Sequence, residues 1–425
     1  MSDLFARMEK DQGPLGQHIK RAHGYFSFPK LEGELGSRMK FRGKEKIIWS
    51  LNNYLGLVNH PDTRKVDGEA AAKYGLGNPM GSRMMSGNTD LHEELEEKLA
   101  KFVSREDAMI LNFGYQGVMS CIDALVSRHD IIVYDGEAHA CLIDGVRLHI
   151  GYSYKYKHND IADCEKQLQR ATKMAEKTGG GILVITEGVF GMSGTQGKLK
   201  ELVALKKDYQ FRLLIDDAHG FGALGATGAG ADEEQGCQAD VDLYFSTFVK
   251  SMGSIGAFIA GPKAIIDFLR YNVRSQIFAK SLPIAVVEGM LKRLEMIKTM
   301  PEFKEKLWHI VNRLQNGLKE RGFDIGKTNS PVTPIYLKGG LPEATGMVMD
   351  IRENYNIFCS VVIFPVIPKG EIIFRLIPTA AHTEEDVDIT LKAFEETKKK
   401  LDEGAYHAEE IPDMSDIGMG LKGEA

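Results

Sequence analysis

Residues 243–253, LYFSTFVKSMG, and residues 212–220, RLLIDDAHG, decide the fold of this 425-residue chain. In each stretch a short apolar run ends in polar or charged side chains. Such runs suit strands that are buried on both faces, as in a mostly parallel sheet. Lys250 follows the first run by a few residues, and Asp216 closes the second run.

A lysine after one strand and an aspartate that closes an earlier strand form the arrangement that pyridoxal phosphate requires. The Lys250 amine can form a Schiff base with the cofactor aldehyde. The Asp216 carboxylate can hold a proton on the pyridine nitrogen, so that the ring accepts electrons. His219 is close enough in sequence to reach the phenolic oxygen. The alternative for Asp216 is a helix N-cap. We predict a pyridoxal phosphate enzyme and no metal site.

Working outward, apolar runs of the same kind recur between residues 56 and 290, with helical patterns between them. This predicts an α/β domain that binds the cofactor on a mostly parallel sheet. The expected strands cover residues 108–111, 131–134, 182–185, 213–215, 243–245 and 257–260.

The pattern changes after residue 290, where long helical stretches alternate with short apolar pieces. Helices are expected over 302–321 and 384–401, and strands over 333–337, 359–364 and 372–376. We therefore expect an N-terminal arm (1–55), a large domain (56–290), a small α+β domain (291–403) and a disordered tail (404–425).

Charge and cysteine content narrow the class of protein. A formal net charge of -6 argues against nucleic acid as a main partner. The five cysteines include no CxxC pair, which is typical of reduced cytosolic thiols. The start of the chain lacks the order of a signal peptide, and no apolar run reaches the ~18 residues of a membrane helix. We expect a cytoplasmic protein, with peripheral membrane contact if it handles lipids.

The stretch NFGYQG at 112–117 lies between an expected strand and an expected helix. Backbone amides at the start of a helix can bind a phosphate, and Gly114 permits a close approach. Thr247 adds a hydroxyl three residues before the lysine. An ordinary turn remains the alternative for this stretch.

Two further side chains suit a cofactor site. His139 comes directly after an expected strand, where an imidazole could stack on the pyridine ring or serve only the structure. Arg375 lies inside an apolar strand, IIFRL, where a buried cation is costly without an anion. A substrate carboxylate could pair with it, and a structural ion pair is the alternative.

Several motifs, in order, resemble those of the α-oxoamine synthases. These are fold-type I pyridoxal phosphate enzymes that condense an amino acid with an acyl-CoA and release CO2. The resemblance extends from about Tyr25 to Leu401. The motifs are NNYLGL (52–57), GSR (81–83), HACLIDG (139–145), TEGVF (186–190), DDAH (216–219), TFVK (247–250) and Arg375 with TAAH (379–382).

The resemblance implies a role for each matched residue. Lys250 binds the cofactor covalently and later moves the α-proton, and His139 stacks on the ring. The residues implied to hold the cofactor are Gly114, Tyr115, His139, Asp216, His219, Thr247, Lys250 and, from the partner in a homodimer, Ser281. Those implied to hold the amino acid are Asn52, Ser82, Arg83 and Arg375.

Within the family, GSR at 81–83 and residues 302–308 are most similar to bacterial serine palmitoyltransferases. The small Ser82 leaves room for a substrate side chain. Gly191 stands where relatives usually have serine, and Val249 is apolar where they have a small or polar residue. These departures fit an altered amino-acid choice, such as cysteate for sulfonolipids. Lys280 is an extra cation near the phosphate site.

The predicted reaction joins serine, or a relative such as cysteate, to a long-chain acyl-CoA and releases CoA and CO2. The alternatives are condensation of glycine with acetyl-CoA, condensation of alanine with pimeloyl-CoA, simple aminotransfer, and a partner subunit without catalysis. Lys250, Asp216 and His219 argue against the last alternative, because such subunits lose the lysine. The sequence leaves the choice of amino acid open.

Overall fold

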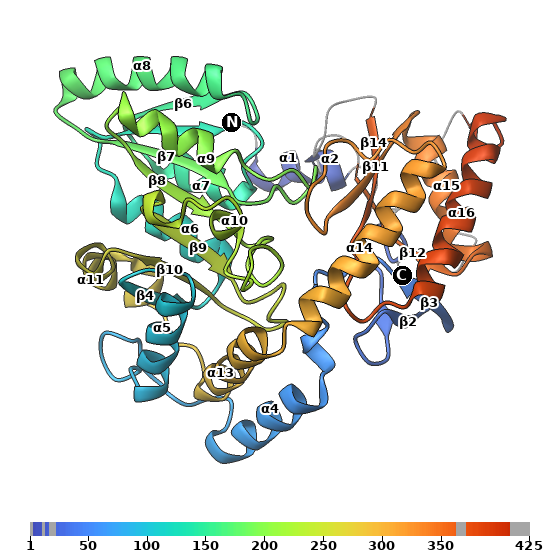
Figure 1. Cartoon of the computed structure of the whole chain (residues 1–425), viewed down its shortest axis with the longest axis horizontal. Coiled ribbons are helices and arrows are strands. Elements are labelled where there is room, and N and C mark those ends of the chain that lie inside the picture. Colours follow the sequence, from blue (N-terminus) through green and yellow to red (C-terminus); the bar gives the residue numbers. More distant parts are fainter. Residues whose placement is uncertain (1–2, 11–12, 17–22, 363–370, 409–425) are drawn as a thin grey trace.

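The computed structural model describes residues 3–10, 13–16, 23–362 and 371–408. Its large domain is built on a seven-stranded sheet in the order β4-β10-β9-β8-β7-β5-β6, shown on the left in Figure 1. The five adjacent strands β9, β8, β7, β5 and β6 run parallel to one another. Strand β10 is antiparallel to both of its neighbours, β4 and β9. The strands are β4 (Asp107–Leu111), β5 (Ile131–Asp135), β6 (Tyr152–Tyr156), β7 (Ile182–Glu187), β8 (Arg212–Asp216), β9 (Leu243–Thr247) and β10 (Ala257–Gly261).

All six strands expected in this domain are present, and the mostly parallel sheet is confirmed. The prediction missed β6, whose sequence YSYKY is mostly exposed at the edge of the sheet. An edge strand needs no continuous apolar run, so the signal that identified the other strands is absent there.

Helices cover both faces of this sheet, so successive strand residues enter different cores. Leu213 and Ile215 belong to one hydrophobic cluster, and Leu214 belongs to the other. The first cluster receives side chains from α5 (Asp90–Phe102), α8 (Ile161–Thr178) and α13 (Ile284–Thr299). The second receives them from α6 (Gly114–Leu125), α7 (Ala140–Leu148) and α11 (Lys263–Asn272). Burial on both faces explains the unbroken apolar runs.

Shorter helices complete the large domain and the N-terminal segment. α4 packs against α13, below the sheet in Figure 1. These elements are α1 (Leu4–Lys10), α2 (Gly13–Gly16), η1 (Leu57–Asn59), α4 (Pro61–Tyr74), α9 (Leu199–Ala204), η2 (Leu205–Lys207), α10 (Ala231–Glu234), η3 (Gln238–Asp240) and α12 (Arg274–Ile277).

The small domain, on the right in Figure 1, packs three helices against an antiparallel sheet of order β11-β14-β13. Its helices are α14 (Glu302–Glu320), α15 (Leu341–Asn354) and α16 (Glu384–Asp402), and its strands are β11 (Thr333–Lys338), β13 (Ser360–Val362) and β14 (Glu371–Leu376). Both long helices expected here are confirmed.

A second sheet joins the N-terminal segment to this domain. It has the order β1-β2-β3-β12, and β3 is parallel to β12. The strands are β1 (Leu31–Glu32), β2 (Arg38–Phe41), β3 (Lys44–Ile48) and β12 (Ile357–Phe358). The single strand expected over 359–364 is therefore wrong in part, because residues 357–358 and 360–362 pair with different sheets. Residues 363–364, and the expected tail from 409 onward, lie outside the described residues. The domain limits stay a prediction.

Backbone hydrogen bonds join residues 49–54, at the end of the expected N-terminal arm, to residues 377–380 of the small domain. Ile377 N–H donates to the Trp49 carbonyl, and Ala380 N–H donates to the Tyr54 carbonyl, each over 2.8 Å. The Trp49 indole stacks on the His382 ring with centroids 3.9 Å apart. This pairing carries residue 52 alongside the end of β14, which contains Arg375.

No helix among the described residues is long and apolar enough to cross a membrane. The five cysteines are all buried and unpaired.

His382 makes the stability of the fold depend on pH. Its Nδ1 accepts the Thr379 N–H over 3.1 Å, its Nε2 faces the Ile48 carbonyl, and burial lowers its pKa to about 4. The unfolded chain binds this proton near pH ~6.5, so stability is lost as pH falls from about 6.5 to 4, by up to roughly 3 kcal/mol. Urea unfolding across this range should show a flatter pH dependence in His382→Gln than in the exposed control His309→Gln. Equal slopes would contradict this account.

Candidate active site

The carboxyl ends of the central parallel strands bring the predicted cofactor residues together. Glu187 closes β7, Asp216 closes β8, and the two are register partners. Thr247 closes β9, and Lys250 follows in a loop held by bonds from Gly253 N–H to the Lys250 carbonyl and from Phe248 N–H to the Gly256 carbonyl. In an open α/β sheet, this edge is where ligands bind.

Lys250 and Asp216 lie within electrostatic range of each other in a buried setting. Burial lowers the pKa of Lys250, while the carboxyls of Asp216 and Glu187 oppose that shift. Burial raises the pKa of Asp216, and Lys250 opposes it. Asp216 Oδ1 accepts the Ala218 N–H over 3.0 Å, which fixes the carboxyl by its own turn. An N-cap role for Asp216 is not seen, because the residues after it form a turn.

Glu187 is a second buried acid in the site, and the sequence reasoning did not assign it a role. Burial raises its pKa well above the usual range, and the charge of Asp216 adds to that shift. When two carboxyls share one buried place, one keeps the proton and the other ionises. Burial favours a proton on Glu187, whereas the charge of Lys250 favours the ionised form of Asp216. The only signal in the sequence was the position of Glu187 at the end of an apolar run.

His139 stands beside these acids. The backbone N–H of His139 donates to Glu187 Oε1 over 2.6 Å, and its ring Nδ1 lies 2.9 Å from the Cys141 Sγ. Cys141 Sγ also lies 3.8 Å from Asp216 Oδ2. Burial lowers the pKa of His139, so the imidazole is neutral at neutral pH. A neutral flat ring next to Asp216 suits stacking on a charged heterocycle.

His219 is held by Tyr54. The Tyr54 hydroxyl lies 2.6 Å from His219 Nδ1, and both side chains are buried. Burial raises the pKa of Tyr54 and lowers that of His219 well below its usual value. The phenol therefore keeps its hydrogen and donates it to Nδ1. We assign the remaining ring hydrogen to Nε2, which makes Nε2 a donor.

The expected phosphate site has a hydroxyl donor without a partner, and its backbone at Gly114 packs closely on Thr247. Thr247 Oγ1 is buried without a hydrogen-bond partner. A Cβ on Gly114 would lie 2.4 Å from Thr247 Cγ2, so only glycine fits there. Helix α6 begins at Gly114 without a side-chain cap, which leaves its first amides free for an anion. Tyr115 is half exposed, and its hydroxyl bonds to Asp144.

Arg375 carries an unpaired charge into the site. It is 8% exposed, and no carboxylate among the described residues lies within ion-pair distance of it. Its Nε donates to the Gly191 carbonyl over 2.6 Å, and its Nη2 donates to Asn52 Oδ1 over 3.3 Å. The alternative of a structural ion pair is therefore not seen. A buried guanidinium held only by neutral acceptors suits an incoming carboxylate.

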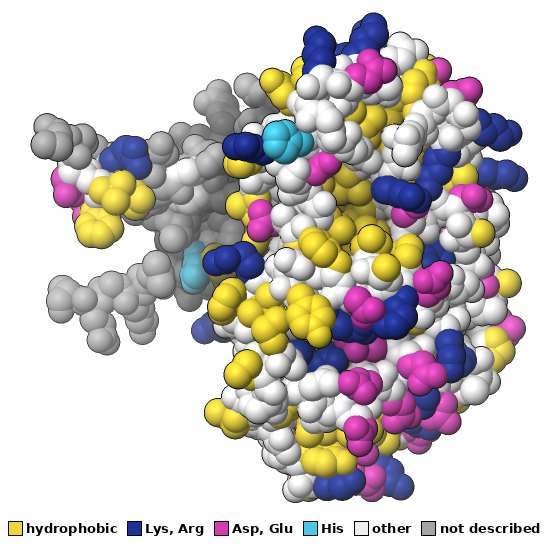
Figure 2. Space-filling model, turned by 90° about the vertical axis from the view of Figure 1, so that its left-hand side faces the viewer, with side chains coloured by type: hydrophobic (Ala, Val, Ile, Leu, Met, Phe, Trp, Pro, Cys, Tyr) yellow, Lys and Arg dark blue, Asp and Glu magenta, His cyan; other side chains and the backbone are white. Residues whose placement is uncertain are grey.

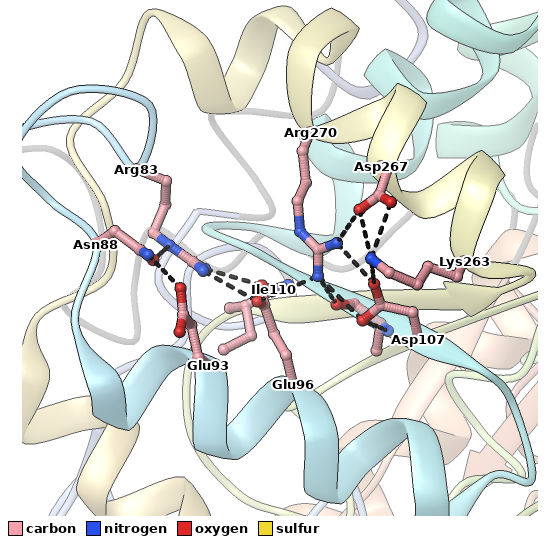
Figure 3. A network of polar contacts seen from close by, with 10 residues as sticks. Arg83, Asn88, Glu93, Glu96, Asp107, Ile110, Lys263, Asp267 and Arg270 are labelled. Carbon is pink, nitrogen blue, oxygen red and sulfur yellow. Dashed lines mark hydrogen bonds and ion pairs between the residues drawn. The ribbon is translucent and has the colours of Figure 1, made fainter.

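Ser82, Arg83 and Ser281 lie together in a different place. The Arg83 guanidinium makes a two-pronged contact with Glu96, over 2.8 and 3.0 Å, as Figure 3 shows. Ser281 Oγ bonds to the Gly81 and Gly87 carbonyls and so closes the loop that contains Ser82. The predicted contacts of Ser82, Arg83 and Ser281 with substrate and cofactor stay predictions.

The residues at the sheet edge fit pyridoxal phosphate. The unpartnered Thr247 hydroxyl, the Gly114 cradle and the free amides of α6 match a phosphate. The buried Asp216 carboxyl matches a protonated ring nitrogen, the His219 Nε2 donor matches a phenolic oxygen, and Lys250 supplies an amine. No group of three or more potential metal ligands occurs among the described residues.

Comparison with known proteins places the chain in a class. The profile of the family described as aminotransferase class I and II matches residues 44–394, and the chain belongs to this family. Within it, the chain is an α-oxoamine synthase, a pyridoxal-phosphate-dependent acyltransferase, as its motifs predicted.

The similar proteins match this chain over most of their length. A cysteate-C-fatty acyltransferase of Capnocytophaga ochracea is 62% identical over 96% of this chain and 97% of its own length. A serine palmitoyltransferase of Bacteriovorax stolpii is 36% identical over 89% of this chain and 88% of its own. The structure of Sphingomonas wittichii serine palmitoyltransferase superposes with a TM-score of 0.87 at 28% identity, over 94% and 99% of the two chains. The predicted fold is thereby confirmed.

We expect the polar network around Glu96 to contribute to the stability of the fold and not to catalysis. Glu96 is 3% exposed and also accepts the Ile110 N–H, while Arg270 lies 3.5 Å from its second oxygen. Removing one charge from a buried network costs about 3 kcal/mol or more. In urea unfolding, Glu96→Gln should lose this amount, whereas the exposed control Glu94→Gln should change by less than about 0.5 kcal/mol. Stability like that of the wild type would show that the network is dispensable.

Proposed function

We propose that this enzyme condenses L-cysteate with a long-chain acyl-CoA, releasing CoA and CO2 and leaving a sulfonated 3-keto amine. The observation that carries the condensation is the buried Arg375 guanidinium of β14, which has no acid partner among the described residues and lies within electrostatic range of Lys250 and His219. The choice of cysteate is supported by the 62% identity with a cysteate-C-fatty acyltransferase, against 36% for a serine palmitoyltransferase.

Each step uses groups of this chain at stated atoms. Arg375, with Asn52, holds the amino-acid carboxylate. When bound, pyridoxal phosphate supplies an electron sink for the carbanion at the α-carbon. Lys250 Nζ is able to take the α-proton, because its lowered pKa keeps the amine neutral more often than an exposed lysine. Asp216 stays charged and holds the ring proton, and His219 donates from Nε2.

Bonds and protons balance in this scheme. The α-carbon bonds to the acyl carbonyl carbon as the bond to sulfur breaks, and CoA leaves as a thiol with one proton. The bond from the α-carbon to the carboxylate then breaks and CO2 departs. A proton delivered to the α-carbon completes the aminoketone. The alternatives with glycine or alanine use the same steps, and no contact of the described residues favours them.

A substrate panel tests the proposal directly. Purified protein loaded with pyridoxal phosphate is given cysteate, serine, glycine or alanine, each with palmitoyl-CoA or acetyl-CoA. Free CoA and product mass are measured. We expect kcat/KM for cysteate with palmitoyl-CoA to exceed that for serine by at least about tenfold, which corresponds to about 1.4 kcal/mol and is close to the worth of one hydrogen bond to a charged sulfonate. Lys250→Ala should lose at least about a thousandfold in turnover, and Lys173→Ala, on the exposed side of α8, should not.

Two outcomes would contradict it. CoA release with glycine and acetyl-CoA alone would move the enzyme to another reaction of the family. Near-normal condensation by Lys250→Ala would remove the role given to this lysine.

We also propose a homodimer in which residues 278–283 approach the partner's cofactor phosphate. Four large apolar side chains in or near the loop closed by Ser281 are at least 70% exposed: Leu76, Met80, Met85 and Phe278. Figure 2 shows further exposed hydrophobic groups scattered among charged ones on one face of the chain. We also propose a cytoplasmic location for the enzyme. Contact with a membrane surface is part of the proposal, because the product is a lipid.

The dimer can be tested by charge. The double variant Met80→Asp/Phe278→Asp puts two carboxylates into the proposed interface. It should therefore sediment as a monomer. Ile150→Asp, at an equally exposed apolar residue near β6, serves as the matched control. A double variant that remains dimeric would show that the interface lies elsewhere.

A further inference from the structure

His158 joins the end of β5 to the turn that follows β7. It comes two residues after β6, and its side chain is 19% exposed. Its ring Nδ1 lies 3.1 Å from Asp135 Oδ1 at the end of β5, and its Nε2 lies 3.0 Å from Thr195 Oγ1. The Asp135 carboxylate also accepts the backbone N–H groups of Glu137 and Asn159, over 2.8 and 3.0 Å, so its place is fixed. Because a carboxylate only accepts, Nδ1 donates to it.

The same ring contacts both ends of the turn 190–195. Phe190 is 2% exposed and packs edge-on against the His158 ring, with centroids 4.3 Å apart. The Phe190 N–H donates to the Thr195 carbonyl over 2.9 Å, which closes the turn. A hydroxyl can donate or accept, so the contact between Thr195 and Nε2 persists whether or not Nε2 carries a hydrogen. His158 thus holds the two residues between which Gly191 lies.

This turn supplies the closest hydrogen bond of the Arg375 guanidinium. The Gly191 carbonyl accepts the Arg375 Nε–H over 2.6 Å, whereas the bond from Nη2 to Asn52 Oδ1 is 3.3 Å long. The carbonyl belongs to the backbone, so its position depends on how the turn is held. The small domain holds the turn through the Ser330 hydroxyl, which donates to the Gly194 carbonyl over 2.8 Å. His158 holds it from the large domain.

We propose that His158 is a positioning residue for Arg375. By fixing Phe190 and Thr195 against the end of β5, it fixes the Gly191 carbonyl and, with it, the guanidinium that receives the amino-acid carboxylate. In this role His158 acts through Arg375 and not on the substrate itself. The proposal rests on the proposed function for the role of Arg375, but it is independent of which amino acid the enzyme prefers.

Amines with and without a carboxylate test this role. Taurine is cysteate without its carboxylate, and ethanolamine is serine without it. Binding of all four to protein loaded with pyridoxal phosphate is measured from the visible absorption of the cofactor. We expect His158→Ala to bind cysteate and serine at least about tenfold more weakly, because the turn loses two contacts. Affinity for taurine, ethanolamine and the cofactor should change by less than about twofold.

Thr195 gives a second set of variants that retain the bulk of the native side chain. Thr195→Val removes the hydroxyl and keeps the branched shape, so we expect about threefold weaker binding of the two amino acids. Thr195→Ser keeps the hydroxyl and should bind them as the wild type does. Thr195→Val also removes a contact with Ser193 Oγ, 2.8 Å away. In a His158→Ala background it should therefore add less than about twofold, since the bond to the imidazole is already gone.

His129→Ala is the matched control, because this exposed histidine precedes β5 at the opposite end of that strand. It should leave every affinity unchanged. If His158→Ala fails to fold, the comparison of Thr195→Val with Thr195→Ser decides. Wild-type affinity for the amino acids in His158→Ala and Thr195→Val would overturn the proposal, and so would an equal loss for the amines or the cofactor. Binding of serine but not of cysteate would instead refute the choice of cysteate, and the comparison of serine with ethanolamine would still test His158.

Discussion

Burial of one amine and two carboxyls at a single sheet edge is the constraint on which the rest of this site depends. Lys250 must lose its charge to accept a proton, and Asp216 must keep its charge to hold one. Burial favours the neutral form of both groups. Glu187 lies in register with Asp216, and burial together with the charge of Asp216 raises its pKa well above the usual range, which favours a proton on Glu187. The alignment of β7 and β8 is therefore part of the chemistry.

The second half of the site comes from the pairing between residues 49–54 and 377–380. Those backbone bonds set Asn52 beside Arg375, on different segments more than 300 residues apart in sequence. Arg375 then faces the large domain, and no acid in the described part of the chain neutralises its charge. Its charge is stabilised when a carboxylate enters, so binding of the amino acid and the placement of the two domains are energetically linked.

The sequence identified what burial on both faces dictates. Continuous apolar runs gave the strands that end at Asp216 and Thr247, and with them the place of Lys250. The edge strand β6 was not predicted, because its side chains are mostly exposed and form no continuous apolar run. The roles of Glu187 and Tyr54 were not predicted, because each acts through a neighbour that is distant in sequence. No local pattern indicates the Glu187–Asp216 register or the Tyr54–His219 bond. The motif that contains Ser281 predicts a contact with the partner's cofactor, and within its own chain the Ser281 hydroxyl donates to two carbonyls.

Arg83 and Arg375 show how such contacts distinguish similar residues. Each arginine is part of a family motif and each was predicted to bind substrate. Arg83 meets the carboxylate of Glu96 within its own chain, so an incoming anion would have to compete with a buried, two-pronged ion pair. Among the described residues, Arg375 donates to the Gly191 carbonyl and the Asn52 amide oxygen, two neutral acceptors that do not compensate its positive charge. The residue type is the same at the two positions, and Arg375 is the more buried of the two. The pairing of the charge is what makes Arg375 the stronger candidate for the substrate carboxylate.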